Sequence, residues 1–203
     1  PTTRIAEHLK HVVQKEKLSA EPELLFQIAK LGNGSMRDSL SLLDRVMATG
    51  EKKLTSRLLE ELVGLPPHEV VGAVLDAVAD GNAKAALEQT DDLISRGISV
   101  EQVIEALSER LRDLMLIAAC GGDTRLIELS DEARSSEQKR ASKFDAAGLV
   151  HMIALCDSVL RSARNSAAPR TLLDALIVRL AMTEKLADVT ALALPTGELA
   201  KKR

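Results

Sequence analysis

Apolar residues recur every three or four positions along almost the whole chain, which is the spacing of one face of an amphipathic α-helix. The alternating pattern of a β-strand is weak everywhere. Aromatic residues are nearly absent, with two Phe and no Trp or Tyr among 203 residues, so the core must be built from Leu, Ile, Val, Ala and Met. Because Leu, Ala and Met favour helices, the sequence predicts an all-α fold.

Glycines, prolines and capping residues divide this pattern into separate helices. The stretch Gly64-Leu65-Pro66-Pro67 is the strongest break, since Gly ends helices and Pro is tolerated only in the first turn of the next one. We predict a small four-helix domain at residues 1–65, a larger helical bundle at 66–192, and the start of a flexible linker or tail at 193–203. The expected helices are 3–16, 21–31, 35–48, 55–63, 67–80, 82–96, 99–119, 145–165 and 169–190, with a charged, less regular segment of short helices at 123–144.

Charge and composition exclude some classes of function. The formal net charge is −3, which argues against a protein that binds nucleic acid over a broad surface. The shortage of aromatic residues argues against a platform for base stacking. Cys120 and Cys156 do not suggest a disulfide framework, and Cys156 reads as a small core residue. With no secretory signal and no apolar run near 20 residues, the chain is expected in the cytoplasm. It begins at Pro1, which indicates a fragment or a processed chain.

The segment GNGSMRDSLSLLDRV, residues 32–46, contains the candidate site. Ser35 is a predicted N-cap, with Asp38 close to the capping-box position, and Met36 begins an inward stripe that continues through Leu40, Leu43 and Met47. Arg37 lies on another face, near a helix terminus whose amides attract anions. A guanidinium there suits a phosphate. The alternative from spacing alone is a solvated surface arginine, free or paired with Asp38.

The run from Gly34 to Asp44 resembles the lid-domain signature of the bacterial DNA polymerase III clamp-loader subunit tau/gamma. Ser39 stands where that family has Ala, and Arg45 where it has Gln. The resemblance implies an AAA+ lid at residues 1–65 whose third helix carries the sensor 2 arginine, and a collar at 66–192 that mediates oligomerisation. It assigns to Arg37 a contact with the nucleotide phosphates, and to Met36 a place close to the base or sugar.

The resemblance also implies a function for the whole protein, namely ATP-driven loading of a sliding clamp onto primed DNA. ATP with Mg²⁺ would be the cofactor, and other clamp-loader subunits would bind through the collar, with no membrane involved. The chain lacks a G-x-x-x-x-G-K-[ST] loop and the family's zinc-binding cysteines and Ser-Arg-Cys arginine-finger motif. These belong to an N-terminal ATPase domain, so we expect no catalytic residue, no ATP hydrolysis and negligible nucleotide binding in this chain alone. The alternative is a non-enzymatic all-helical adaptor or oligomerisation module.

Other candidates are weaker. His8 and His11 could form half of a metal site, but no third ligand stands nearby. His68 and His151 are isolated. Several charged residues are expected on solvated helix faces: Glu60, Glu61, Asp91, Asp92, Glu109, Arg110, Arg112 and Asp113. Three arginines lie around the break at 165–170: Arg161, Arg164 and Arg170. They would either contact a partner or DNA, or cap the helix ends and face solvent, and the second interpretation is favoured. The sequence contains no basic recognition helix, which argues against helix-turn-helix DNA binding.

Overall fold

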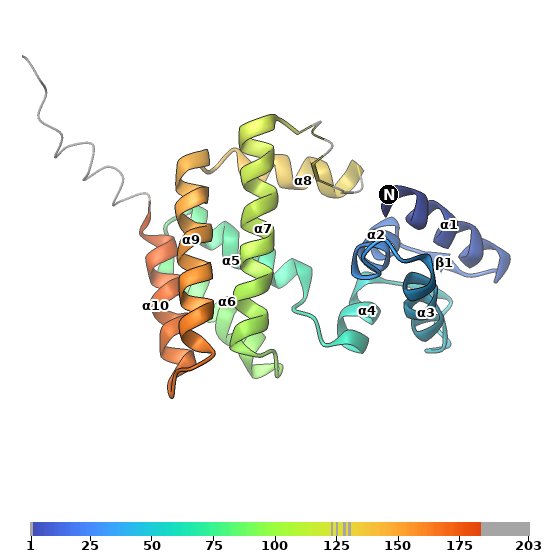
Figure 1. Ribbon diagram of the computed structural model, residues 1–203, viewed down its shortest axis with the longest axis horizontal. Helices are drawn as coiled ribbons and strands as arrows, with labels where there is room; N and C mark the ends of the chain where they lie inside the picture. The colour runs from blue at the N-terminus through green and yellow to red at the C-terminus, as the bar shows by residue number, and fades with distance from the viewer. Residues whose placement is uncertain (1, 123, 125, 128, 130, 184–203) are drawn as a thin grey trace, which may run out of the picture.

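The computed structural model describes residues 2–122, 124, 126–127, 129 and 131–183, and these residues form ten α-helices and two very short β-strands. The all-α prediction is therefore confirmed. Two helical bundles, each around its own core, lie at opposite ends of the molecule (Figure 1). The N-terminal bundle contains α1 (Thr2–Lys15), α2 (Pro22–Leu31), α3 (Met36–Met47) and α4 (Ser56–Val63). The C-terminal bundle contains α5 (His68–Ala79), α6 (Ala83–Ser95), α7 (Val100–Cys120), α8 (Asp131–Ala141), α9 (Ala146–Ala163) and α10 (Pro169–Ala181).

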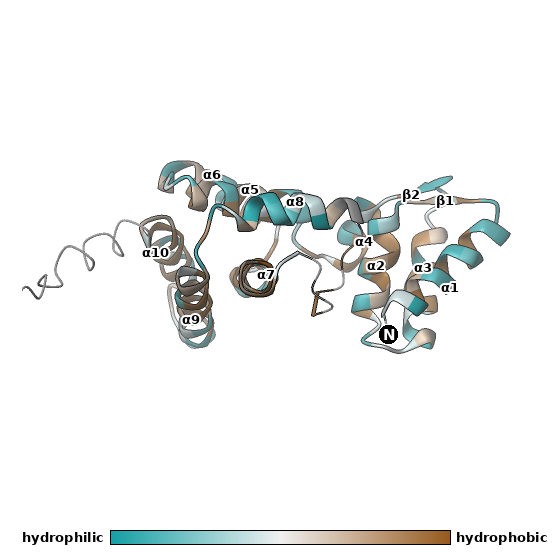
Figure 2. Cartoon of the chain, turned by 90° about the horizontal axis from the view of Figure 1, so that it is seen from above, coloured by the Kyte–Doolittle hydropathy of each residue, from teal (hydrophilic) through white to brown (hydrophobic). Residues whose placement is uncertain are grey.

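The N-terminal bundle packs the apolar faces of α1, α2, α3 and α4 around one cluster that includes Leu9, Leu24 and Leu43. The hydropathy colouring shows these helices polar on the outside and apolar toward the cluster (Figure 2). A two-residue parallel ladder joins β1 (Ser19–Ala20) to β2 (Lys53–Leu54). This ladder could not be predicted from the sequence, because two residues are too few to show an alternating pattern.

Local capping explains where five of the ten described helices begin. Five residues that precede helices accept a hydrogen bond, through the side chain, from the amide three residues on, as an N-cap does: Ser35, Thr55, Asn82, Ser99 and Asp145. Ser99 and Gln102 form a reciprocal capping box at the start of α7. Gly64 ends α4 in the left-handed conformation, at φ 72°, which Gly adopts without steric cost.

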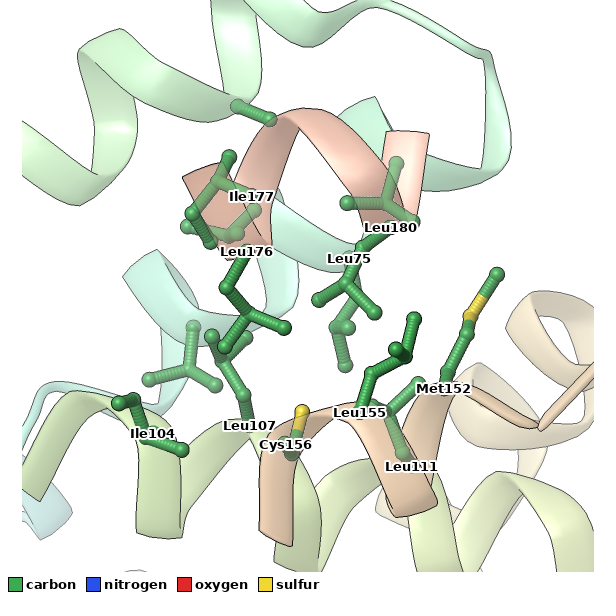
Figure 3. Packing of buried hydrophobic residues seen from close by; sticks show 14 of the residues in the cluster. Leu75, Ile104, Leu107, Leu111, Met152, Leu155, Cys156, Leu176, Ile177 and Leu180 are labelled. Atoms are coloured by element: carbon green, nitrogen blue, oxygen red, sulfur yellow. The ribbon is translucent and has the colours of Figure 1, made fainter. Parts of the chain in front are cut away.

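The C-terminal bundle is built around α7 and α9, which pack along each other, while α5 and α6 form a hairpin covered by α10. Its core is aliphatic, with side chains from α5, α7, α9 and α10 meeting as Figure 3 shows. Cys156 is fully buried in this core, as predicted, and burial raises the pKa of its thiol to about 12. Cys120 is exposed.

Two parts of the chain differ from the sequence prediction or lie beyond it. Residues 131–141, part of the segment predicted to hold short helices, form one continuous helix, α8, although almost no apolar face marks it. The last predicted helix begins at Pro169 as expected and is described to Ala181. Its predicted continuation to residue 190 and the predicted tail at 193–203 lie outside the described residues.

Helix α9 qualifies the expectation that no stretch could span a membrane. Among the described helices it is long and apolar enough to do so by length and composition, with a mean hydropathy of 1.3. In this fold, however, Leu149, Met152 and Cys156 of α9 are part of the C-terminal core.

Residues 64–67 connect the two bundles, and α4 and α5 meet there at a bend of 96°. Three polar contacts brace this connection. Gln102 Nε2 donates to the carbonyl of Gly64 at 3.0 Å, and the amide of His68 donates to Glu60 Oε1 at 2.9 Å. Lys30 of α2 forms an ion pair with Glu109 of α7.

Candidate functional site

The loop between α2 and α3 sets the position of the candidate arginine. Asn33 and Gly34 both have positive φ angles, 47° and 82°, and the amide of Ser35 donates to the carbonyl of Gly32 at 2.8 Å. Asn and Gly are the residues that tolerate this left-handed geometry best. The tight turn therefore starts α3 immediately after α2 ends.

Ser35 caps the new helix, as the sequence predicted. Its hydroxyl oxygen accepts from the amide of Asp38 at 3.3 Å, which leaves the first amides of α3 directed away from the helix body. Arg37 lies in this first turn and is exposed, and within the described part of the chain it forms no ion pair, with Asp38 or any other carboxylate. A free guanidinium and the partial positive charge of a helix N-terminus thus share one surface.

Met36 is the second predicted site residue, and it is partly buried against the core of the N-terminal bundle. Its side chain therefore belongs to the inward stripe of α3 along with Leu40 and Met47, while Leu43 is fully buried. Only the part of Met36 left uncovered by this packing could contact another molecule.

Ser39 contributes a contact that the sequence did not reveal. Its side chain is fully buried, and its hydroxyl donates to the carbonyl of Ser35 at 2.9 Å. A Cβ built at Gly32 would collide with Ser39 Oγ, so the two residues pack directly against each other. The Gly32–Ser39 contact fixes the angle at which α3 leaves the loop, and hence the direction in which the first turn faces.

The first turn of α3 offers groups that suit a phosphate, but no further groups that would enclose a nucleotide. Arg37 and the helix terminus offer the charge and the donors that bind phosphate oxygens. The chain has no G-x-x-x-x-G-K-[ST] sequence to wrap a triphosphate, and the described residues contain no group of three His, Cys, Asp or Glu placed to hold a metal ion. This surface could therefore contact a phosphate held by another domain.

The remaining surface candidates divide in two. His8, His11 and His151 are exposed. The three arginines near the break at 165–170 are paired with carboxylates on the bundle surface. Arg161 pairs with Asp157, Arg164 with Glu105, and Arg170 with Asp91 and Asp174. These ion pairs agree with the favoured interpretation, in which the arginines face solvent and stabilise the helix ends.

The solvated-face prediction was wrong for Glu60, Arg110 and Asp113, each of which is less than 9% exposed. Arg110 Nη2 donates to Glu137 Oε1 at 2.6 Å, and its Nη1 donates to the carbonyl of His68 at 3.3 Å. Their burial follows from the packing of α8 and the residue 64–67 connection onto α7. One signal was available in the sequence: Arg110 stands three residues after Leu107 and four before Leu114, inside the apolar stripe of α7.

These buried groups line a cavity of about 400 Å³ between the two bundles. Burial raises the pKa of Glu60 and that of Asp113, because the charged carboxylates lose hydration. Burial, together with the nearby positive charges of Arg110 and Arg140, lowers the pKa of His68 to about 3. His68, which stands alone in the sequence, is therefore a neutral imidazole in the wall of this cavity.

Comparison with known proteins identifies the family. Residues 4–52 match the model of the DNA polymerase III clamp loader subunit, ATPase lid domain, and residues 54–193 match the model of DNA polymerase III subunits gamma and tau domain III. Arg37 lies in the first of these regions and the cavity-lining residues of α7 and α8 in the second.

Curated relatives agree with both models. The chain is 26% identical over 129 residues to DNA polymerase III subunit tau of Salmonella typhimurium, covering 62% of this chain and 20% of the relative. It is 24% identical over 201 residues to subunit tau of Bacillus subtilis, covering 98% of this chain and 35% of the relative. The chain therefore covers only about a fifth of the length of the first relative and about a third of the length of the second.

A solved structure supports the fold alone. The Bacillus subtilis DNA clamp loader delta protein superposes with a TM-score of 0.52 at 11% identity, over 89% of this chain and 56% of that one.

Because the gamma and tau domain III model alone covers more than half of the residues, and the lid model covers most of the rest, the chain belongs to the tau/gamma family of bacterial DNA polymerase III clamp-loader subunits.

Proposed function

We propose that this chain is the lid and collar part of a clamp-loader ATPase subunit, in which the N-terminal bundle senses nucleotide and the C-terminal bundle holds neighbouring subunits. The observation that carries the proposal is the exposed, unpaired Arg37 in the capped first turn of α3, within the residues that match the lid model. The surrounding protein would load a sliding clamp onto primed DNA at the expense of ATP.

In this proposal ATP and Mg²⁺ are bound by an ATPase domain that is not among these residues. Arg37 would contact the γ-phosphate, and the uncovered part of Met36 would lie near the base or sugar. We expect neither nucleotide binding of measurable affinity nor hydrolysis from residues 1–203 alone, because the chain has no phosphate-binding loop.

The switch follows from a difference in contacts. A guanidinium–phosphate contact that forms with ATP and is lost with ADP makes the interaction between the lid and the nucleotide stronger in the ATP state. Only such a difference in interaction free energy can shift a conformational equilibrium. Arg37 is part of α3, and the Gly32–Ser39 packing joins the start of α3 to the loop that follows α2. A change at the phosphate would therefore rotate the N-terminal bundle as a unit.

The C-terminal bundle would supply the assembly surface. The outer faces of α7 and α9 form a shallow groove with apolar Met115, Val150 and Ile153, of which Val150 is 55% exposed. Charged Glu105 and Arg112 border it. An apolar centre with a charged rim is the usual composition of a subunit contact. Self-association, or assembly with other clamp-loader subunits in the bacterial cytoplasm, would use this face.

The test is Arg37→Ala in the full-length protein, with Arg57→Ala as the matched control, since Arg57 is also exposed on the N-terminal bundle but pairs with Glu61. One lost charge-assisted phosphate contact is worth about 1.5–3 kcal/mol. We therefore expect ATP-dependent clamp loading to fall by about 10-fold to 100-fold for Arg37→Ala and to stay unchanged for Arg57→Ala, with equal thermal stability. Loading that is equal in both variants would remove the sensor assignment from Arg37.

A further inference from the structure

The apolar cores of the two bundles do not meet. Among the described residues, one core and the side chains packed against it end at Val63, and the other begins at Val70. Phe26 of α2 and Ala106 of α7 line the cavity of about 400 Å³ that lies between the bundles. Close apolar packing sets the angles between helices inside a bundle, but it contributes little to the angle between these two bundles.

The connection at residues 64–67 has little conformational freedom of its own. Each proline holds its φ angle at about −65° and restricts the residue before it, and the φ angle of Pro67 is −57°. Gly64 is the exception, because a glycine with a φ angle of 72° can reach other conformations without steric cost. A rotation of one bundle against the other would therefore occur mainly at Gly64.

Glu60 joins the two helices that meet at this bend. Its carbonyl accepts from the amides of Gly64 and Leu65, which ends α4. Its carboxylate oxygen Oε1 accepts from the amide of His68, the first amide of α5, at 2.9 Å. Pro67, at the N-cap position of α5, provides no side-chain hydrogen bond. A carboxylate of the N-terminal bundle therefore caps the first helix of the C-terminal bundle.

Gln102 makes a second hydrogen bond across the same boundary. Its Oε1 accepts from the amide of Ser99 at 3.0 Å and completes the capping box of α7. Its Nε2 donates to the carbonyl of Gly64 at 3.0 Å. One side chain therefore holds both the start of α7 and the glycine of the connection. The ion pair of Lys30 and Glu109 also crosses the boundary, but its side chains are 51% and 55% exposed, and such pairs contribute little.

We propose that Glu60 and Gln102 hold the two bundles at one angle, as a lock on the rotation at Gly64. A turn at Gly64 moves α4 relative to α5 and α7. It would separate Glu60 from the His68 amide, and the Gly64 carbonyl from Gln102, and the loss of both hydrogen bonds opposes the turn. In the clamp loader, the lock would make a rotating lid carry the collar with it; this consequence rests on the proposed function, whereas the lock itself does not.

The angle between the bundles can be followed by pulsed electron paramagnetic resonance on the 203-residue chain without nucleotide. One spin label is attached to Cys120, which is exposed at the end of α7, and the other to Gln14→Cys on the exposed face of α1; Cys156 is buried. We expect one narrow distribution of distances between the labels. A broad distribution in this labelled chain would show that the bundles turn freely and would overturn the proposal.

Glu60→Ala removes the cap of α5. Glu61→Ala is the matched control, because Glu61 is the next residue of α4 and pairs with Arg57 at the exposed surface. The fraction of molecules outside the main distance should rise by about twofold to tenfold for Glu60→Ala and stay unchanged for Glu61→Ala. Glu60→Gln keeps an oxygen that can accept from the His68 amide, so its distribution should stay close to that of the unsubstituted chain. Equal distributions in Glu60→Ala and Glu61→Ala would contradict the lock.

Gln102→Glu tests the other hydrogen bond, and it remains informative if Glu60→Ala lowers stability. The variant keeps the oxygen that accepts from Ser99 and loses the donor to Gly64, so α7 retains its capping box. We expect the outlying fraction to rise by about twofold to tenfold with unchanged helix content by circular dichroism. An unchanged distance distribution would overturn the proposal. These measurements involve neither nucleotide nor Arg37, so their outcome is distinguishable from that of the Arg37→Ala loading test.

Discussion

Helices α7 and α8 are neighbours that the fold fixes by opposite means. Helix α7 buries an aliphatic stripe, with Ile104, Leu107, Leu111 and Leu114 fully enclosed. Helix α8 has almost no apolar face, and Glu137 is its most buried charged side chain. One helix is held by loss of apolar surface from water, and the other by ion pairs.

The ion pairs of α8 form a connected network and not a set of isolated contacts. Glu137 Oε1 accepts from Arg110 of α7 and from Arg140 one turn further on, at 2.6 and 2.5 Å. Arg140 also makes a two-pronged contact with Asp76 of α5, at 3.1 and 2.9 Å. Through these contacts α8 ties α5 to α7. Such a network depends on every partner, because a buried charge left alone is costly.

The largest effect should come from the apolar side of this comparison. Leu111→Ala leaves a cavity in the C-terminal core, and comparable changes cost about 2–5 kcal/mol. We expect that loss in urea unfolding. Cys120→Ala, an exposed position at the end of the same helix, should change the free energy of unfolding by less than about 0.5 kcal/mol. A loss below about 1 kcal/mol for Leu111→Ala would mean that α7 is not held by its apolar core.

The same contrast explains what the sequence could predict. Periodicity identifies helices that bury apolar residues, so α7 was expected nearly as observed, whereas α8 offered no stripe to detect. The place of Arg110 in the apolar stripe indicated its burial, but its partners, His68 and Glu137, are 42 and 27 residues away in sequence and could not be predicted. Pairing over such separations leaves no local pattern.

The candidate site was more predictable than the cavity, because it is local. The Ser35 cap and the position of Arg37 in the first turn follow from adjacent residues. The Gly32–Ser39 contact also spans few residues, but it depends on the exact angle between α2 and α3. An N-cap is a pattern of neighbouring residues, whereas the direction in which the helix then runs depends on how it packs against α2.

An intermediate, local effect is expected from Glu137→Gln. The change keeps the shape of the side chain but removes the charge that compensates buried Arg110. Removing one partner of a buried pair costs about 3–5 kcal/mol, but α8 can avoid part of that cost by detaching and letting water reach Arg110. Hydrogen exchange should therefore accelerate in α8 well before it does in α7 or α9. Uniform acceleration through all three helices would show that α8 is part of the cooperative core.

The smallest effect is expected from an exposed ion pair beside the buried network. It tests whether the contribution of an ion pair to the free energy of unfolding depends on its burial. Lys143, just beyond α8, pairs with Asp80 at 3.1 Å but remains 43% exposed. Exposed pairs are worth about 1 kcal/mol or less, so Lys143→Met should lower the free energy of unfolding by no more than that, and by less at high salt. A double-mutant cycle with Asp80→Asn separates the pair from the rest of the surface. A coupling energy as large as the Glu137→Gln effect would mean that the whole network, exposed and buried parts alike, acts as one unit in holding α8.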